Sequence, residues 1–277
     1  MIAIITSSKD IASMAIRQQL LENYGFRDTG QPFDGFPVYA LPVEQEEARL
    51  FTISADSVHA EGIDKMIPAG LFIFATRHVS KAGVPALTTH SIGNWGEAQF
   101  GGREGTVCPV SPRLLKLFLQ NLSAVAKSDG YSGEVVQEAT HHGPYLEKPA
   151  VFIEVGSSEN EWKDVKLASM VADSLIGGLG DFVAPEMQDE IGSFVPVVGL
   201  GGPHYCSTFT RLMLEREFAV GHICPKHHLP GLSEKLLRQA MAACGAEKVA
   251  VDWKSLGQEK IDVKALLDGM GVEWFRI

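Results

Sequence analysis

Residues 71–78 read Leu-Phe-Ile-Phe-Ala-Thr-Arg-His, an apolar run that ends in polar residues. Such a run is typical of a strand buried on both faces of a sheet. Four further segments repeat this order, with histidine at or just after the end of an apolar run. In open α/β sheets, ligands bind outside the carboxyl ends of the strands, so these segments predict a metal or acid–base centre there. They contain eight of the nine histidines: His78, His90, His141, His142, His204, His222, His227 and His228.

Helical segments alternate with these strand-like runs along the chain. Residues 2–7 predict a first buried strand, and Asp10 can cap the helix that follows it. Ser158 and Glu161 form a capping box for a helix that we expect to run to about Ile176. This alternation predicts an α/β fold with a mixed, largely parallel sheet and helices on both faces.

The 277 residues contain no internal repeat, low-complexity tract or linker. We therefore expect residues 1–277 to form a single α/β domain. Short strand-like runs between turn residues fill positions 27–58, and they predict β structure inserted in the N-terminal third.

Composition limits the classes of function. The four cysteines are widely spread without a CxxC pair, which favours a reducing, cytoplasmic location. We expect no membrane association, because no run reaches the roughly 18 apolar residues that a transmembrane helix needs. The net charge of −10 argues against broad electrostatic binding to nucleic acid, although a local basic patch would permit it. Candidates for a patch, which could equally be scattered solvated charges, are Arg77, Lys81, Arg113, Lys116, Lys226, His227 and His228.

The densest chemical motif is EATHHGP at residues 138–144. Glu138, His141 and His142 could surround one ion, since zinc accepts both imidazole nitrogen and carboxylate oxygen. The spacing is not the helical HExxH pattern of zinc proteases. Alternatively, one histidine is a hydrogen-bonded core residue and Glu138 pairs with a base.

Two further loops offer ligand-binding groups. GLGGPHY at residues 199–205 is no dinucleotide fingerprint, because the third glycine is missing at the required offset. Its glycines could bring backbone close to a ligand and aim His204 and Tyr205 inward, or simply make a turn. Asn94 and Trp95 could supply a polar donor and a stacking platform, or Trp95 could cover the edge of the sheet.

Six motifs together resemble the archaeal and plant type of D-aminoacyl-tRNA deacylase. They are TRH with Ser80-Lys81, LTTHSIGNW, EATHHGP, FIEVGSSENEW, GLGGPHY and GHI, and they occupy about residues 70–225 in the order of that family. The resemblance implies hydrolysis of the ester that joins a D-amino acid to tRNA, which is chiral proofreading. It also implies zinc dependence and a fold similar to peptidyl-tRNA hydrolase and phosphorylase/hydrolase-like proteins. The pair His227-His228 is not part of the resemblance.

The motifs and the resemblance together assign roles to individual residues. Zinc lowers the pKa of its bound water from about 15.7 to near 7, so one or two zinc ions would activate the attacking water. We expect the metal ligands among Glu138, His141, His142, His204, His78, His90 and His222, the last three serving a second ion. Catalytic candidates are Glu138, His141, His142, Glu154 and His90, with Glu154 as an orienting group or general base. Expected substrate contacts are Arg77, Lys81, Asn94, Trp95 and Tyr205, with Arg103 and Lys226 as further phosphate contacts.

Two other functions fit the same residues. One is a zinc-dependent hydrolase of small esters or amides, which would lack a basic patch beside the histidines. The other is a nucleic-acid-binding protein in which zinc, closed by four protein ligands, only stabilises the fold. The preferred interpretation is a deacylase that acts on D-aminoacyl-tRNA. We expect it to have no obligate protein partner and to be a monomer.

Overall fold

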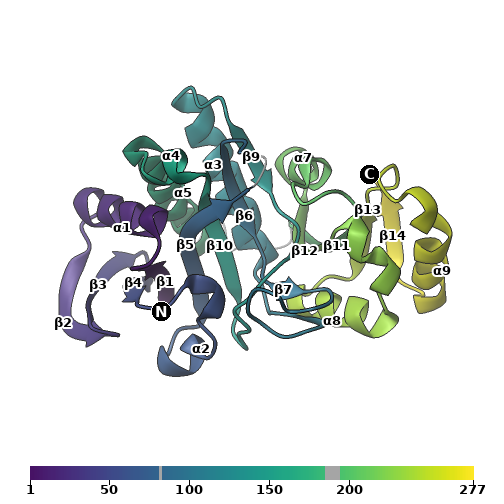
Figure 1. Cartoon of the computed structure of the whole chain (residues 1–277), viewed down its shortest axis with the longest axis horizontal. Coiled ribbons are helices and arrows are strands. Elements are labelled where there is room, and N and C mark those ends of the chain that lie inside the picture. The colour runs from purple at the N-terminus through teal and green to yellow at the C-terminus, as the bar shows by residue number, and fades with distance from the viewer. Residues whose placement is uncertain (81–82, 185–193) are drawn as a thin grey trace.

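The computed structural model describes residues 1–80, 83–184 and 194–277. Strands and helices alternate along the chain, and the predicted α/β class is confirmed (Figure 1). The strands form two main sheets, which the sequence pattern did not distinguish. The eight-stranded sheet contains β1 (Ile2–Ser7), β2 (Arg27–Phe33), β3 (Phe36–Val43), β4 (Glu46–Ile53), β5 (Leu71–Val79), β6 (Ala86–His90), β9 (Glu134–Gln137) and β10 (Ala150–Ser157). The four-stranded sheet contains β11 (Val195–Leu200), β12 (Phe218–Cys224), β13 (Lys248–Val251) and β14 (Glu273–Arg276).

Strand direction changes three times across the large sheet, whose order is β2-β3-β4-β1-β5-β10-β6-β9. Strands β4, β1, β5 and β10 are parallel, and the expected β insertion is the antiparallel edge formed by β2 and β3 with β4. At the other edge β6 is antiparallel to β10, and β9 is parallel to β6. The small sheet, in the order β12-β11-β13-β14, is entirely parallel. A minor ribbon pairs β7 (Gly93–Asn94) with β8 (Thr106–Val107).

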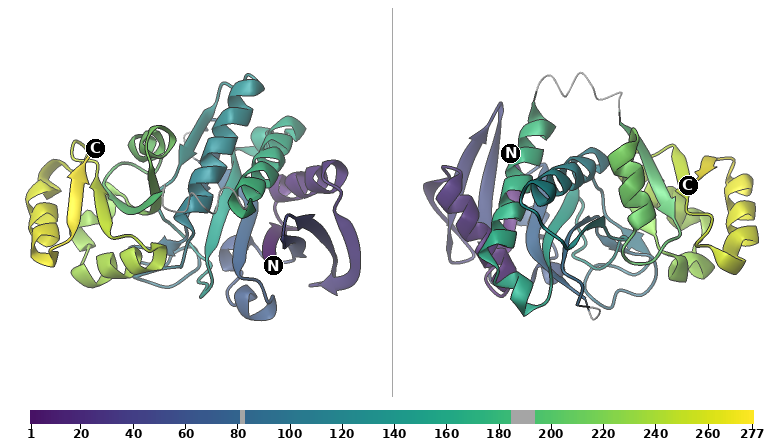
Figure 2. Two further views of the ribbon diagram at one scale, coloured as in Figure 1. Left: turned by 180° about the vertical axis from the view of Figure 1, so that it is seen from behind. Right: turned by 90° about the horizontal axis from the view of Figure 1, so that it is seen from above.

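Three long helices pack on one face of the large sheet (Figure 2): α1 (Ile11–Asn23), α3 (Pro112–Ser128) and α5 (Val165–Val183). Helix α3 also contacts β12 of the small sheet, so it packs against both sheets. The small sheet is accompanied by α7 (Ser207–Glu215), α8 (Glu234–Cys244) and α9 (Lys260–Met270). Short helical turns are α2 (Ile63–Met66), α4 (Glu159–Trp162) and the 3-10 segments Ser57–His59, Lys226–Gly231 and Gly257–Glu259.

Helix starts follow the predicted caps. The side chain of Asp10 accepts a hydrogen bond from the Ser13 amide at 3.0 Å. The capping box of Ser158 and Glu161 is present. The single helix expected to reach Ile176 is wrong, however, because α4 ends at Trp162 and Asp164 caps a separate helix, α5.

The buried side chains form two clusters on opposite faces of the large sheet. Ile4, Ile73 and Ile153 point toward the long helices, while their neighbours Ile5, Phe74 and Phe152 point to the other face. That other face is covered by α2 and by loops, not by long helices. The helix-side cluster also includes Val249 of the small sheet. We therefore propose that both sheets belong to one domain.

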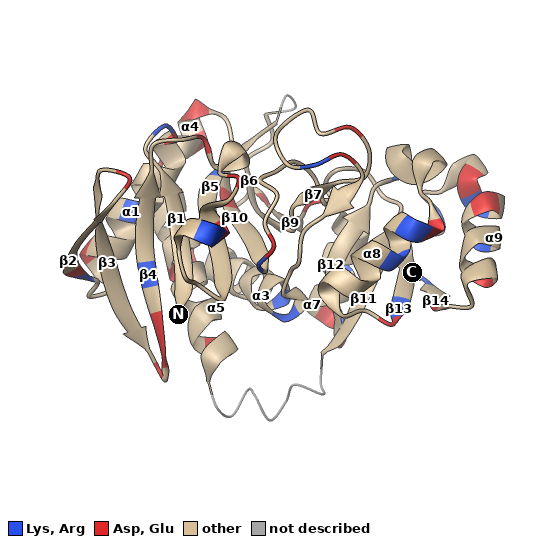
Figure 3. Cartoon of the chain, turned by 90° about the horizontal axis from the view of Figure 1, so that it is seen from below, with Lys and Arg blue, Asp and Glu red and all other residues tan. Residues whose placement is uncertain are grey.

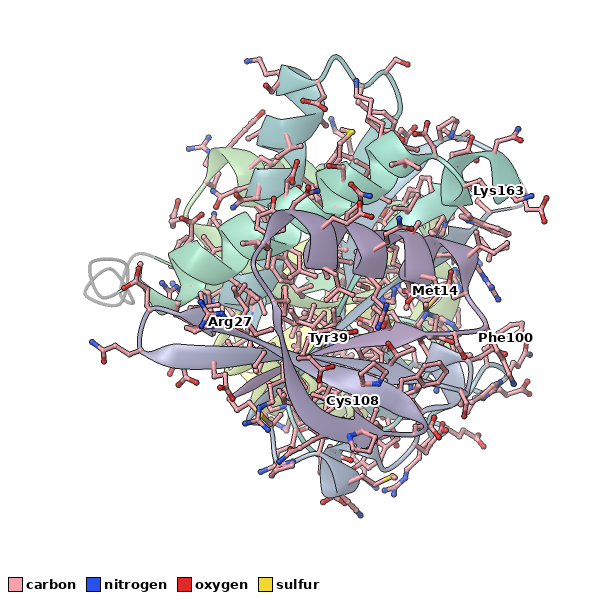
Figure 4. The ribbon with its side chains drawn as sticks, turned by 90° about the vertical axis from the view of Figure 1, so that its left-hand side faces the viewer. Met14, Arg27, Tyr39, Phe100, Cys108 and Lys163 are labelled. Atoms are coloured by element: carbon pink, nitrogen blue, oxygen red, sulfur yellow. The ribbon has the colours of Figure 1, made fainter. Side chains whose placement is uncertain are left out.

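Figure 4 views the N-terminal end of the molecule, where α1, with Met14 labelled, lies across the strands that carry Arg27 and Tyr39. The guanidinium of Arg17 lies 5.3 Å from the Tyr39 ring centroid. Across the described ranges, no helix has both the length and the apolarity needed to cross a membrane.

Candidate metal and catalytic site

Three of the candidate residues lie on adjacent strands of the large sheet. Strand β10 pairs with β5 and β6 so that Glu154 lies opposite Thr76, and Phe152 opposite His90. Because side chains alternate along a strand, His78, Glu154 and His90 all project from the same face. His78 and His90 lie at the carboxyl ends of β5 and β6, as predicted, but these ends do not meet at one edge of the sheet. Strand β6 runs antiparallel to β10, so its carboxyl end points away from that of β5, and the groups meet on the face of the sheet.

Residues 138–142, directly after β9, connect this face to the small sheet. The Glu138 amide donates to the Thr89 carbonyl of β6 at 3.0 Å. The next amides turn to the other sheet, with Ala139 donating to the His204 carbonyl at 2.9 Å and Thr140 to the Ile223 carbonyl at 3.1 Å. This bridging segment (residues 138–142) places Glu138, His141 and His142 between the two sheets.

The first group of potential ligands consists of His90, His141 and His142, which can each offer an atom within 4.8 Å of the others. The Nδ1 atoms of these rings lie 3.1, 2.8 and 2.6 Å from the carbonyl oxygens of Ser91, Ala139 and Gly143, respectively. A carbonyl can only accept a hydrogen bond, so each Nδ1 is the protonated nitrogen. In a neutral ring each Nε2 then carries a lone pair, as in metal-ligating histidines. Burial lowers the pKa of His90, but the contacts with Glu154 and Glu138 outweigh burial and raise it, so an ion would displace a proton from this ring.

The second group consists of His78, Glu138 and His204, whose ligand atoms also lie within 4.8 Å of one another. Nδ1 of His78 is 3.0 Å from Oε1 of Glu138, and Nε2 of His204 is 2.7 Å from Oε2 of the same carboxylate. Thus Glu138 holds one imidazole from each sheet.

Glu154 joins the two groups. Its Oε2 atom lies 3.6 Å from Nδ1 of His78 and 3.6 Å from Nε2 of His90. Its other oxygen accepts a hydrogen bond of 2.6 Å from the Thr76 hydroxyl. Both Thr76 and Glu154 are buried, so this contact fixes the carboxylate between the groups.

Burial and close partners shift the pKa values in opposite directions. Burial alone would raise the pKa of Glu138, but hydrogen bonds from His204 and His78 and the charge of His78 hold it well below its usual value. Burial lowers the pKa of His78, but the contacts with Glu138 and Glu154 outweigh burial and raise it to about 11. Burial and the neighbouring His90 lower the pKa of His142 to about 4. At pH 7 the metal-free site therefore holds two ionised carboxylates, Glu138 and Glu154, beside a neutral His142.

Among the described residues, two histidine ring nitrogens are buried without a hydrogen-bond partner. These are Nε2 of His78 and Nε2 of His90. Buried polar atoms are rarely left unpaired, and an unpaired one calls for an unseen ligand, water or ion. At His90 the unpaired atom belongs to the three-imidazole group, so the residues present fit a zinc ion.

His222 differs from the other predicted ligands. It is fully buried in β12, with Nδ1 3.2 Å from the Thr140 hydroxyl and Nε2 3.0 Å from the Cys108 carbonyl. Burial lowers its pKa to about 3. With both nitrogens engaged and no place in either group, His222 supports the bridging segment through Thr140.

Asn94 and Trp95 are structural in this arrangement. The Trp95 side chain is 4% exposed and its indole donates to the Ile223 carbonyl at 2.9 Å, so it offers no open stacking face. The Asn94 amide donates to the carbonyls of Gly101 and Arg103 and ties the loop at residues 91–107 together.

The remaining predicted contacts are spread around the site. Tyr205 lies beside it, with its ring 5.4 Å from that of His78. Arg77 lies near Trp162, 5.5 Å from the ring, and Arg103 stacks 3.6 Å from Tyr145. Lys81 lies outside the described residues.

The expected basic patch is not assembled as a whole. Lys116 is 3% exposed and its ammonium donates to the Phe218 carbonyl at 3.0 Å, so it cannot contact a nucleic acid. Arg113 donates to the Phe182 carbonyl. Sequence reasoning also missed Phe100, which is 67% exposed at the periphery in Figure 4 and whose carbonyl accepts the Gly143 amide next to His142. An aromatic residue before two glycines was the available signal.

The chain is similar in sequence and in structure to known proteins. A family model described as D-aminoacyl-tRNA deacylase matches residues 66–275. A D-aminoacyl-tRNA deacylase of Thermococcus kodakarensis is 36% identical over 99% of this chain and 98% of its own length. That of Methanosarcina mazei is 33% identical over 98% of this chain and 90% of its own length. A crystal structure of a conserved protein of unknown function is 29% identical, has a TM-score of 0.86, and covers 100% of this chain and 95% of its own.

Proposed function

The chain belongs to the D-aminoacyl-tRNA deacylase family of hydrolases, and we propose that it cleaves D-aminoacyl-tRNA with a zinc-activated water. The products are the free D-amino acid and tRNA, so the enzyme removes the wrong enantiomer before translation. One observation carries the zinc part of the proposal. Three imidazoles converge with Nδ1 on backbone carbonyls, which leaves each Nε2 available as a ligand atom, and Nε2 of His90 is buried without a hydrogen bond.

His90, His141 and His142 would hold the ion through these Nε2 atoms. Three histidines leave a coordination position open, as in catalytic zinc sites. A zinc ion there would supply Lewis acidity that makes water a nucleophile at neutral pH.

Glu138 and His204 would handle the protons. The lowered pKa keeps Glu138 ionised, and its oxygen 2.7 Å from Nε2 orients the His204 ring. The His204 side chain is 42% exposed, whereas His78 and Glu138 are almost fully buried, so His204 is the member of the group that a substrate can reach. We assign it the proton transfer to the leaving ribose oxygen while water adds to the ester carbonyl and the carbon–oxygen bond breaks. If the enzyme binds two ions, His78, Glu138 and His204 would hold the second instead.

The proposal is tested by incubating the protein with D-Tyr-tRNA and L-Tyr-tRNA in parallel, before and after chelation and with zinc added back. We expect rapid loss of the D ester alone, abolished by the chelator and restored by zinc. Hydrolysis of small D-amino-acid esters but not of D-Tyr-tRNA would contradict the assignment and favour the small-molecule hydrolase. D-selective activity that survives complete removal of zinc would retain the reaction and refute the metal mechanism.

We also propose that the enzyme acts in the cytoplasm as a monomer. The four cysteines are free and buried, which suits a reducing compartment. Light scattering coupled to gel filtration would test the monomer, and a mass near twice the 30.0 kDa chain would refute it.

A further inference from the structure

A cavity lies outside the candidate catalytic groups, beside the loop at residues 91–107. Its volume is about 400 Å³, and the chain segment before α8 and the first turns of that helix form its other wall. The polar side chains that line it include Glu104, His227, His228, Lys235 and Gln239, and Trp95 also lines it. The proposed chemistry uses none of these residues.

Two segments of the chain connect the cavity to the catalytic groups. The loop beside it starts at Ser91, next to His90. In the second segment, the Lys226 amide donates to the Gly202 carbonyl at 2.9 Å, two residues before His204.

The charge of this cavity contrasts with that of the whole chain, which is −10. Glu104 is the only carboxylate among its described lining residues. Nearby Glu234 is engaged by Arg238 at 2.8 Å, and no ion pair involves Lys235 in the part of the chain that the structure describes. Figure 3 shows basic residues on α8, on the side viewed from below. The cavity thus offers an ammonium group and two imidazoles that no protein carboxylate holds.

We propose that this cavity binds the sugar–phosphate backbone of the tRNA acceptor end. The inference rests on the proposed function and names where the tRNA is held. Lys235 and the imidazoles of His227 and His228 would contact a phosphate, since such donors bind phosphate oxygens without reading sequence. The terminal ribose ester would then lie at His204, on the other side of the Gly202 loop. An acidic protein would in this way confine its attraction for RNA to the one strand that carries the substrate.

The test measures binding of uncharged tRNA to the zinc-loaded protein by fluorescence anisotropy, so it does not depend on catalysis. Two probes are compared: intact tRNA, and the same tRNA without its three 3′-terminal nucleotides. The variants are Lys235→Ala and His228→Asn, and Lys127→Ala near the end of α3 serves as a matched control for loss of an exposed lysine.

We expect Lys235→Ala to weaken binding of intact tRNA about tenfold, because one charged hydrogen bond is lost. Its salt dependence should fall by about one ion. Binding of the trimmed tRNA should not change, and Lys127→Ala should leave both probes unaffected. Equal weakening of both probes, or no change in either, would overturn the proposal. These outcomes are independent of D-Tyr-tRNA hydrolysis, so failure of the deacylase assignment would be recognised separately.

Discussion

Nε2 of His204 lies 2.7 Å from Oε2 of Glu138, although the first residue follows a strand of the small sheet and the second a strand of the large one. The contact places an ionised, buried carboxylate against the most exposed imidazole of the two groups. Glu138 also contacts His78 at 3.0 Å, so it is the residue on which the second group converges.

The variant Glu138→Gln should separate the effect of the negative charge of this side chain from the effect of its size and shape. The amide retains the size of the side chain, but it cannot hold His78 and His204 as an anion. We expect kcat for D-Tyr-tRNA to fall at least about 100-fold, at the upper end of losses measured for groups that orient metal sites. Single-turnover deacylation with excess enzyme measures this loss, and a kcat within threefold of wild type would rule out the assigned role.

His141→Ala and His142→Ala should each release zinc. Each removes one of the three Nε2 ligands proposed for the ion, so we expect less than half of the wild-type zinc content after dialysis. Elemental analysis of the purified variants measures it. His222→Asn is the matched control: it removes a buried histidine outside both groups and should keep its zinc. Retention of zinc by both alanine variants would remove the ion from these histidines.

Chelation should lower the melting temperature of the wild-type protein. An ion that binds only the folded state at 100 times its Kd stabilises it by about 2.7 kcal/mol. Differential scanning fluorimetry with and without chelator should therefore show a clear shift, absent from His141→Ala. A shift of the same size in that variant would place the stabilising ion elsewhere.

Acid should destabilise the metal-free protein partly through His222. Burial holds its pKa at about 3 in the folded state against 6.5 as a free group. The unfolded chain therefore binds the extra proton, and stability is full above pH 6.5 and declines as the pH falls toward 3. We expect the wild-type protein to lose about 1.4 kcal/mol more than His222→Asn between pH 7.5 and 5.5. Parallel urea denaturation curves give the difference, and equal losses would show that His222 is not buried as a neutral ring.

Thr76→Val should reveal whether the orientation of Glu154 matters. The valine keeps the shape of the buried side chain and removes the 2.6 Å hydrogen bond to the carboxylate. We expect kcat to fall about tenfold, with KM and zinc content near wild type, since such positioning contacts are worth about 10- to 100-fold. Thr76→Ser, which restores the hydroxyl, should recover most of the activity. Equal kcat in Val and Ser variants would exclude a positioning role.

Much of the fold follows from local sequence. The caps at Asp10 and Ser158 and the apolar strands are properties of a few neighbouring residues, and the structure has them where the sequence predicts them. The division into two sheets and the reversal of β6 depend on pairing between distant segments, which no local pattern encodes. That reversal is the reason that the candidate site lies on the face of the sheet and not at its edge.

The candidate site, like the fold, was predictable from local sequence only in part. The motif EATHHGP predicted the segment that contributes to both ligand groups, and these groups include every predicted metal ligand except His222. Histidines that follow strands look alike in sequence, whether they point into a polar site or donate within the core. For Trp95, the alternative of a packed ring fits its burial, which depends on contacts with β12 that no local pattern encodes.

The order in which the segments of the site are synthesised has a consequence for the nascent chain. The loop that carries His204 is held from later in the chain, because the Gly202 amide donates to the Ser255 hydroxyl at 2.7 Å and β11 pairs with β13. During translation, His78, His90 and Glu138 therefore leave the ribosome well before the residues that bring His204 to them. With the role proposed for His204, a nascent chain surrounded by aminoacyl-tRNA would be an incomplete hydrolase until β13 has been made and has folded.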